Sequence, residues 1–183
     1  MDTLWTDYIN SHWHDWRGSG LSEDRLSSPK WQASFLKRYG LTAPVPASPE
    51  ELVSMHRLRI HLRDMVHSFA ETNTVTDAQI KLLNEYLAKG TLTRKLRRAD
   101  SALQLEYITL SGADWSLALA EVAANFAETV ARGSGDRIRI CGNPDCRWIF
   151  YDDTRSRTKR YCEEKSCGNL MKVRRFRAKH KQE

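Results

Sequence analysis

The chain has 183 residues, 40% of them hydrophobic, with a formal net charge of +6, which predicts one medium-sized domain or a domain with a small appended module. No run of eighteen apolar residues exists to span a membrane, and the first sixteen residues lack the basic and then apolar layout of a signal peptide. We therefore expect a cytoplasmic protein with a sizeable core and no membrane partner.

The first ninety residues predict four helices. Apolar side chains recur at helical spacing from Leu4 to Trp16, so we expect one helix over residues 4–16 with a buried aromatic face. The next three helices have capping signals at their starts, and these signals are Ser28-Pro29, Ser48-Pro49-Glu50-Glu51 and Thr76-Asp77-Ala78-Gln79. His12 and His14 would face apart on a helix, so no second metal site is predicted there.

Residues 92–110 change to the alternating pattern of a half-buried strand, with Leu103, Leu105 and Tyr107 at the apolar positions. A turn at residues 99–101 would complete a β-hairpin. Asp114 then caps a long helix over roughly residues 115–131, and a Gly/Ser-rich stretch follows it. We expect a helical sensor or dimerisation domain over residues 1–132, a flexible linker over 133–137 and a C-terminal module over 138–183. The fold class is therefore α+β.

All the cysteines lie in the last quarter of the chain, as two C-x₄-C pairs separated by fifteen residues, and they are Cys141, Cys146, Cys162 and Cys167. Four thiols in one short window are the ligand set of a tetrahedral structural site, and in the cytoplasm paired cysteines favour metal over disulfides. We predict one structural Zn²⁺ per chain. Its four sulfur ligands leave no open position for catalysis.

The segments around the cysteines predict the fold of the module. Short strands are expected at residues 138–140 and 148–151, followed by a helix capped by Asn169. An apolar stripe at Leu170, Val173 and Phe176 would pack on the metal core. This order is the layout of a treble-clef zinc finger, with a looser zinc ribbon as the alternative.

Positive charge is concentrated in the same module. Residues 137–183 hold fourteen Arg/Lys and six Asp/Glu, a net charge of +8, whereas residues 1–136 have a net charge of −2. This pattern favours a nucleic-acid surface over a merely solvated face. The predicted contacts to nucleic acid are Arg155, Arg157, Lys159, Arg160, Lys172, Arg174, Arg175 and Arg177.

The string from Cys141 to Cys162, followed by Cys167-Gly168-Asn169-Leu170, resembles the CGNR zinc finger, which in a bacterial family follows an N-terminal ABATE domain. Upstream, Asp7-Tyr8-Ile9-Asn10 and residues 58–63 and 83–87 are also similar to that family. The resemblance implies a stress-induced transcriptional regulator. Leu170 stands where the family motif has Arg, so a phosphate contact of that Arg would pass to Lys172 or Arg174.

We therefore predict a DNA-binding transcriptional regulator. RNA binding and a protein-interaction adaptor are the alternatives that the sequence leaves open. No nucleophile elbow, phosphate-binding Gly loop or H-E-x-x-H pattern is present, which argues against an enzyme. The N-terminal domain is expected to bind a small-molecule ligand or to form a homodimer.

Overall fold

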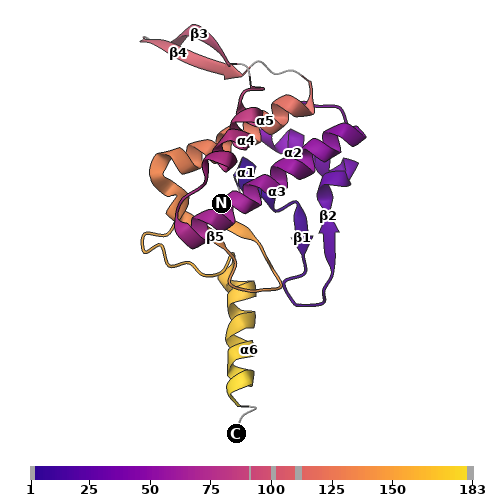
Figure 1. The fold of residues 1–183 in the computed structure, drawn as a ribbon, viewed down its shortest axis with the longest axis vertical. Coiled ribbons are helices and arrows are strands. Elements are labelled where there is room, and N and C mark those ends of the chain that lie inside the picture. Colours follow the sequence, from indigo (N-terminus) through magenta and orange to yellow (C-terminus); the bar gives the residue numbers. More distant parts are fainter. Residues whose placement is uncertain (1–2, 91, 100–101, 110–112, 181–183) are drawn as a thin grey trace.

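The computed structural model of the protein describes residues 3–90, 92–99, 102–109 and 113–180 (Figure 1). The helices are α1 (Leu4–Ile9), α2 (Pro29–Tyr39), α3 (Pro49–Thr72), α4 (Asp77–Leu87), α5 (Trp115–Thr129) and α6 (Asn169–Lys179). Antiparallel strand pairs are β1 (His12–His14) with β2 (Ser22–Asp24), β3 (Leu92–Ala99) with β4 (Ala102–Thr109), and β5 (Ile138–Ile140) with β6 (Ile149–Tyr151). The predicted α+β class is confirmed. Within the described ranges, no helix combines the length and the apolar character that a membrane crossing requires.

The middle helices begin at their predicted capping residues. At the start of α3, the Ser48 amide donates to the Glu51 carboxylate at 2.6 Å, and the Glu51 amide donates to Ser48 Oγ at 3.2 Å. Thr76 and Gln79 form the same reciprocal box at the start of α4. Each box satisfies amide hydrogens that a helix N-terminus leaves unpaired, so local chemistry sets these boundaries.

The predicted helix over residues 4–16 is wrong in its second half. Helix α1 ends at Ile9, and the chain turns at Asn10 into strand β1. The buried Asn10 side chain donates to the Ile149 carbonyl at 2.7 Å and accepts the Ile149 amide at 2.9 Å. These two bonds satisfy the open edge of β6, so a contact made only in the folded chain replaces the second half of the helix.

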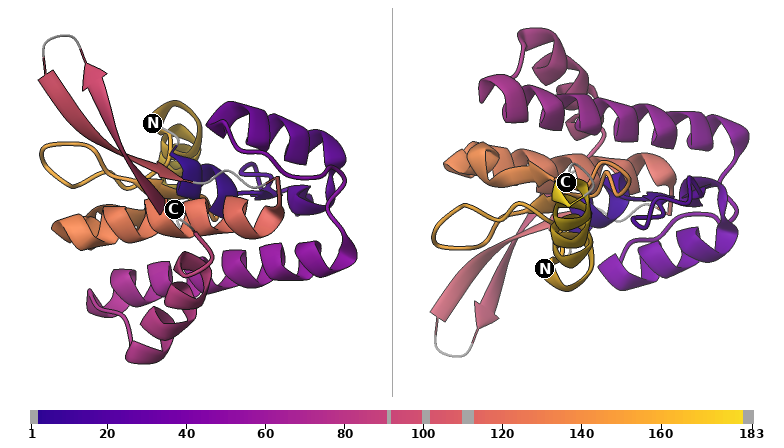
Figure 2. Two further views of the ribbon diagram at one scale, coloured as in Figure 1. Left: turned by 90° about the horizontal axis from the view of Figure 1, so that it is seen from above. Right: turned by 90° about the horizontal axis from the view of Figure 1, so that it is seen from below.

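The main hydrophobic core lies where α1 and α5 run between α2 and α3 (Figure 2). Trp5 of α1 is fully buried and meets the ring of Phe126 edge-on, with centroids 5.3 Å apart. The buried Tyr8 hydroxyl donates to the Met55 carbonyl at 2.7 Å. Together these contacts join α1 to both α5 and α3.

The β3–β4 hairpin projects from the helical body at the end opposite to α6 (Figure 1). Its strands pair as predicted, while residues 100–101 of the predicted turn lie outside the described residues. The expectation of half-burial is wrong for Leu103, which is 63% exposed, and Leu96 on the paired strand is 61% exposed. The backbone ladder therefore holds this hairpin together more than core packing does.

The zinc module and the N-terminal helices share the main core. Ile138 of β5 and Ile149 of β6 are 2% and 0% exposed and belong to the same cluster as the core of α1, α3 and α5. The predicted flexible linker is instead a π-helical turn, Val130–Ser134, followed by a 3₁₀ turn, Gly135–Arg137. Strands β5 and β6 thus pack on the helical body, while a second hydrophobic cluster around the cysteines belongs to the zinc module alone. The division into residues 1–132 and 138–183 stays a prediction.

Replacement of Asn10 by Ala should destabilise the chain, because it leaves the buried amide and carbonyl of Ile149 without partners. We expect a loss of about 2–4 kcal/mol in the free energy of unfolding, measured by urea titration. Asn84→Ala, at an exposed position of α4, is the matched control and should change the midpoint little. Equal midpoints for the two variants would mean that Asn10 does not hold β6 in place.

Candidate zinc centre and nucleic-acid interface

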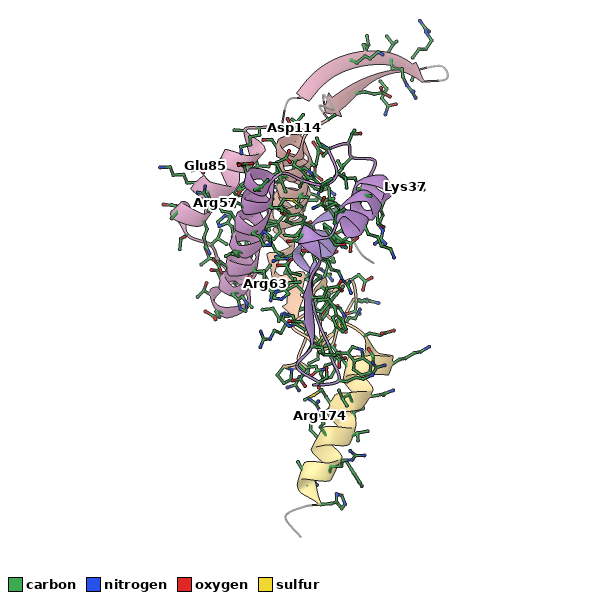
Figure 3. All side chains as sticks on the ribbon, turned by 90° about the vertical axis from the view of Figure 1, so that its right-hand side faces the viewer. Lys37, Arg57, Arg63, Glu85, Asp114 and Arg174 are labelled. Carbon is green, nitrogen blue, oxygen red and sulfur yellow. The ribbon has the colours of Figure 1, made fainter. Side chains whose placement is uncertain are left out.

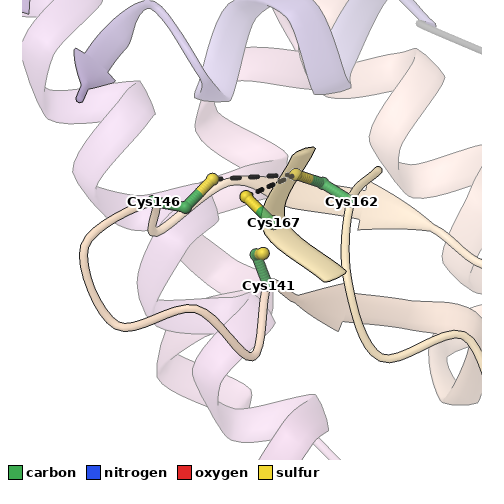
Figure 4. A group of neighbouring side chains, drawn as sticks. All are labelled: Cys141, Cys146, Cys162 and Cys167. Carbon is green, nitrogen blue, oxygen red and sulfur yellow. Dashed lines mark hydrogen bonds between the residues drawn. The ribbon is translucent and has the colours of Figure 1, made fainter. Parts of the chain in front are cut away.

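The four cysteines come together from separate segments of the C-terminal module. Cys141 follows β5, Cys162 ends the loop after β6, and Cys167 lies in a π-helical turn, Glu164–Gly168, before α6. All four sulfur atoms lie within 4.8 Å of one another. The Cys162 sulfur is 3.6 Å from that of Cys146 and 3.8 Å from that of Cys167 (Figure 4). A tetrahedral zinc with Zn–S bonds of about 2.3 Å requires sulfur separations of about 3.8 Å.

The loop between the first two cysteines is held by Asn143. This side chain is fully buried, and its Nδ2 donates to the Cys167 sulfur at 3.5 Å and to the Trp16 carbonyl at 2.8 Å. The Cys146 amide donates to the Asn143 carbonyl at 3.1 Å, which closes the turn. The loop therefore places two ligands and also ties the finger to the segment after β1.

Crowding of the thiols drives their pKa values apart. Hydrogen bonds from Cys146 and then Cys162, followed by backbone amides, lower the pKa of Cys141 well below its usual value. Hydrogen bonds to Cys141 raise the pKa of Cys146 and of Cys162. A divalent cation makes all four thiolates favourable and displaces their protons. The four-sulfur donor set and its spacing fit one structural Zn²⁺, and all four predicted ligands are brought together.

A buried aspartate shapes the basic loop that runs from β6 to Cys162. Asp152 is 0% exposed, and its carboxylate accepts the Thr154 amide at 3.0 Å and the Lys159 amide at 2.9 Å. Burial alone would raise the pKa of Asp152, but these hydrogen bonds outweigh it and lower the pKa. The ionised side chain thus stabilises the basic loop, defined here as residues 153–160.

A hollow of about 370 Å³ lies between the basic loop and β5. Its cationic side chains are Arg139, Arg157, Lys159 and Arg160, and none of the described residues that line it is acidic. Gly142 also lines it, and a Cβ there would lie only 3.1 Å from the Arg160 carbonyl, so a small residue lets the loop approach. Several converging donors of positive charge can bind a phosphate group.

Helix α6 projects from the body, and none of its residues is buried (Figure 1). The predicted N-cap is wrong: Asn169 lies inside the helical segment and donates to the Lys165 carbonyl at 3.2 Å, because the preceding π-helical turn runs directly into α6. The predicted packing of the apolar stripe is also wrong, since Val173 is 45% and Phe176 is 64% exposed. Met171 packs against the cysteines instead.

The eight cationic residues predicted to bind nucleic acid fall into two groups. Three have carboxylate partners, and these pairs are Arg157–Asp136, Lys172–Glu164 and Arg174–Asp145. The other five form no ion pair with the residues that the structure describes, and they are Arg155, Lys159, Arg160, Arg175 and Arg177. Of these five, all but Lys159 are exposed; the Lys159 ammonium lies 5.3 Å from the centre of the Phe150 ring.

Arg174 fastens α6 to the rest of the molecule (Figure 3). Its Nη1 donates to the Asp145 carboxylate at 2.6 Å, and its Nη2 donates to the Arg17 carbonyl at 3.0 Å. Gly18 lies against this pair with a φ of +91°, and a Cβ there would sit 2.7 Å from Arg174 Nη2. Arg174 is thus a positioning residue for α6, a role that its charge alone did not indicate.

Sequence reasoning also missed the residues that orient this surface. Asn143 and Asp152 were not singled out from the sequence, and Arg139 was included only within the predicted strand at residues 138–140. A turn-forming Asn or Asp is the available sequence signal, because its side chain can accept or donate backbone hydrogen bonds. Their distant partners become visible only in the folded chain.

Two family models together cover nearly the whole chain. Residues 2–133 match the ABATE family, described as "Putative stress-induced transcription regulator", and residues 137–180 match the CGNR zinc finger. Among curated proteins, none matches the chain. The first match covers the helical body and the second contains all four zinc ligands. The chain therefore belongs to the ABATE family and carries a CGNR zinc finger behind its ABATE domain.

Proposed function

We propose that this protein is a transcriptional regulator whose zinc finger binds double-stranded DNA through α6 and the basic loop. The observation that carries the proposal is the exposure of α6, a cationic helix with no fully buried residue, in the same zinc module as a hollow lined by four cations. Of the described residues of α6, only Met171 packs against a hydrophobic cluster, the one around the cysteines. The exposed cationic remainder of the helix can therefore bind in a negatively charged groove.

The dimensions of α6 suit the major groove. Its eleven residues span about 16 Å, and the groove of B-DNA is about 12 Å wide and admits one helix. In this arrangement Arg175 and Arg177 contact phosphates or base edges, while Arg155 and Arg160 contact the neighbouring backbone. Arg174 holds the helix at its angle to the finger through Asp145.

Zinc supplies rigidity and no chemical step. Four cysteines complete its coordination shell, so water has no position at which to become a nucleophile. The matched families are of the regulatory and zinc-finger type. We therefore infer a role in regulation, in the cytoplasm, with the ABATE domain receiving a signal or forming a homodimer.

A second candidate function is protein docking by α6, which the exposure of Val173 and Phe176 favours. These side chains lie among cations rather than in a wide apolar face, so we place nucleic acid first. RNA carries the same backbone phosphates as DNA, so the choice between DNA and RNA is left to the competition experiment.

Competition at fixed salt tests the proposal. A labelled DNA duplex bound to the zinc-loaded full chain should be displaced by unlabelled duplex DNA at lower concentration than by RNA of equal length. Affinity should also fall with salt, with a slope of about −0.9 for each duplex phosphate neutralised. Preferential displacement by RNA would replace DNA with RNA in the proposal, and an affinity independent of salt would favour the docking role.

A further inference from the structure

Two arginines at the junction of the ABATE domain and the zinc finger have no anionic partner among the residues that the structure describes. Arg63 lies on α3, one turn after Arg59 and toward the α6 end of the molecule from Arg57 (Figure 3). Arg147 directly follows the zinc ligand Cys146 and has a positive φ of 54°. Among the residues that the structure describes, neither arginine forms an ion pair or a side-chain hydrogen bond. Arg63 is nevertheless partly buried.

Backbone and side-chain contacts bring these arginines to the start of β1. Asn10 binds the backbone of Ile149, two residues after Arg147. On the other side, Arg59 Nη1 donates to Ser11 Oγ at 3.0 Å. The segment from Asn10 to His12 thus lies between α3 and the first loop of the zinc finger. Arg63 is one helical turn beyond Arg59 on α3, and Arg147 is two residues before Ile149, so both backbones lie near this segment.

Two histidines of β1 complete the cluster. The expectation that His12 and His14 face apart is wrong, because they lie on a strand and their rings are 4.4 Å apart. Burial chiefly lowers the pKa of both rings, and the charges of Arg63 and Arg147 lower each further. The rings are therefore neutral at pH 7, and each still offers one N–H donor.

The nearby carboxylate does not balance this charge. The Asp24 carboxylate accepts hydrogen bonds from Nη1 and Nη2 of Arg59, the first at 2.8 Å. Nε2 of His56 lies 3.2 Å from the same carboxylate. Partial burial would raise the pKa of Asp24, but the hydrogen bonds and charge of Arg59 hold it well below its usual value. Asp24 therefore forms its ion pair with Arg59. It forms none with Arg63 or Arg147.

Positive charge is consequently only partly compensated at this junction. Burial, followed by repulsion from Arg59 and Arg147, lowers the pKa of Arg63, and the neighbouring Asp64 offsets only part of this effect. An unpaired, partly desolvated guanidinium is unfavourable, and an anion placed beside it recovers that free energy.

We propose that Arg63 and Arg147, with His12 and His14, form a binding site for a phosphate group at the junction of the two domains. Guanidinium groups match the oxygens of phosphate in geometry, and the neutral imidazoles add uncharged donors. The phosphate belongs either to a small phosphorylated molecule or to a nucleic-acid backbone. In both cases it contacts α3, β1 and the zinc finger together, so its binding stabilises the domains in one arrangement. The inference does not depend on α6 binding DNA.

The test measures melting temperature with inorganic phosphate, using the zinc-loaded full chain and potassium chloride to keep ionic strength constant. Phosphate should raise the melting temperature of the wild type in a saturable manner. Arg63→Met should melt higher than the wild type without phosphate, since it removes repulsion, and should bind phosphate at least about tenfold more weakly. Arg147→Asn, which tolerates the positive φ, should lose the phosphate effect in the same way.

Arg57→Met is the matched control on the same helix, because Arg57 is exposed and 3.7 Å from Glu85 rather than in the cluster. It should retain the full phosphate effect. The hollow beside the basic loop can also bind phosphate. The comparison of variants therefore shows which of the two sites causes the effect. A phosphate effect that is absent in the wild type, or equal in Arg63→Met and Arg57→Met, would overturn the proposal.

Duplex DNA then identifies the source of the phosphate. If Arg63→Met binds duplex as tightly as the wild type while losing inorganic phosphate, the site accepts a small phosphorylated molecule. If its duplex affinity also falls, with a salt slope shallower by about one phosphate, the site accepts the nucleic-acid backbone. Both results support a phosphate site.

Discussion

Cys162→Ser is expected to abolish zinc binding and to destabilise the whole chain, well beyond the finger. Structural zinc contributes on the order of 10 kcal/mol in small zinc modules, as much as the total stability of many domains. Metal analysis should fall from one equivalent per chain to none. Because Ile138 and Ile149 belong to the main core and Asn10 binds Ile149, loss of the finger should also lower the melting temperature of the helical body.

Ser156→Ala is the control for this experiment, since Ser156 lies exposed in the same module and its hydroxyl forms a hydrogen bond with the hydroxyl of Thr158. It should retain zinc and melt like the wild type. Far-UV circular dichroism reports mainly on the helical body, which holds α1 to α5. If Cys162→Ser lost zinc and the helical signal melted as in the wild type, the shared core would contribute little.

The double change of Arg175 and Arg177 to Ala should give the largest loss of DNA affinity without loss of stability. Both side chains are exposed on α6, and neither has a carboxylate partner within the part of the chain that the structure describes. Removal of two charged contacts should weaken binding about 10- to 100-fold, and the salt slope should decrease by about 1.8. The measurement is duplex affinity as a function of salt concentration.

Two further variants separate contact from positioning. Lys81→Ala, at an exposed position of α4, controls for net charge and should leave the slope unchanged. Arg174→Ala should lower both affinity and melting temperature, because it breaks the bonds to Asp145 and Arg17. An unchanged slope in the double variant would show that α6 serves another partner.

Local sequence chemistry was sufficient wherever a few neighbouring residues decide the outcome. The capping boxes at Ser48 and Thr76 placed helix starts correctly, because the hydrogen bonds of a cap join residues only three positions apart. The zinc ligands were equally readable, since cysteine is rare in this chain and the spacing of the pairs is regular. The resemblance to the CGNR zinc finger and the ABATE domain was readable for the same reason.

Predictions failed where a residue had two possible partners. Helical spacing between Leu4 and Trp16 was genuine, yet Asn10 binds β6, and the chain leaves the helix there. Likewise, the spacing of Val173 and Phe176 suited a buried stripe, but α6 extends away from the body and leaves both side chains exposed. Periodicity shows that one face could be buried and does not say whether another element covers it.

The sequence alone therefore determined the composition of the zinc site, the helical character of the body, the family and the location of positive charge. Only the tertiary structure decided which charges are already paired, as Arg174 is with Asp145, and which have no ion-pair partner in the described part of the chain, as is the case for Arg63 and Arg147. It also decided that Ile138 and Ile149 join the main core across the expected linker. The physical reason is that pairing and burial depend on distances between segments far apart in the chain, and neither composition nor spacing contains those distances.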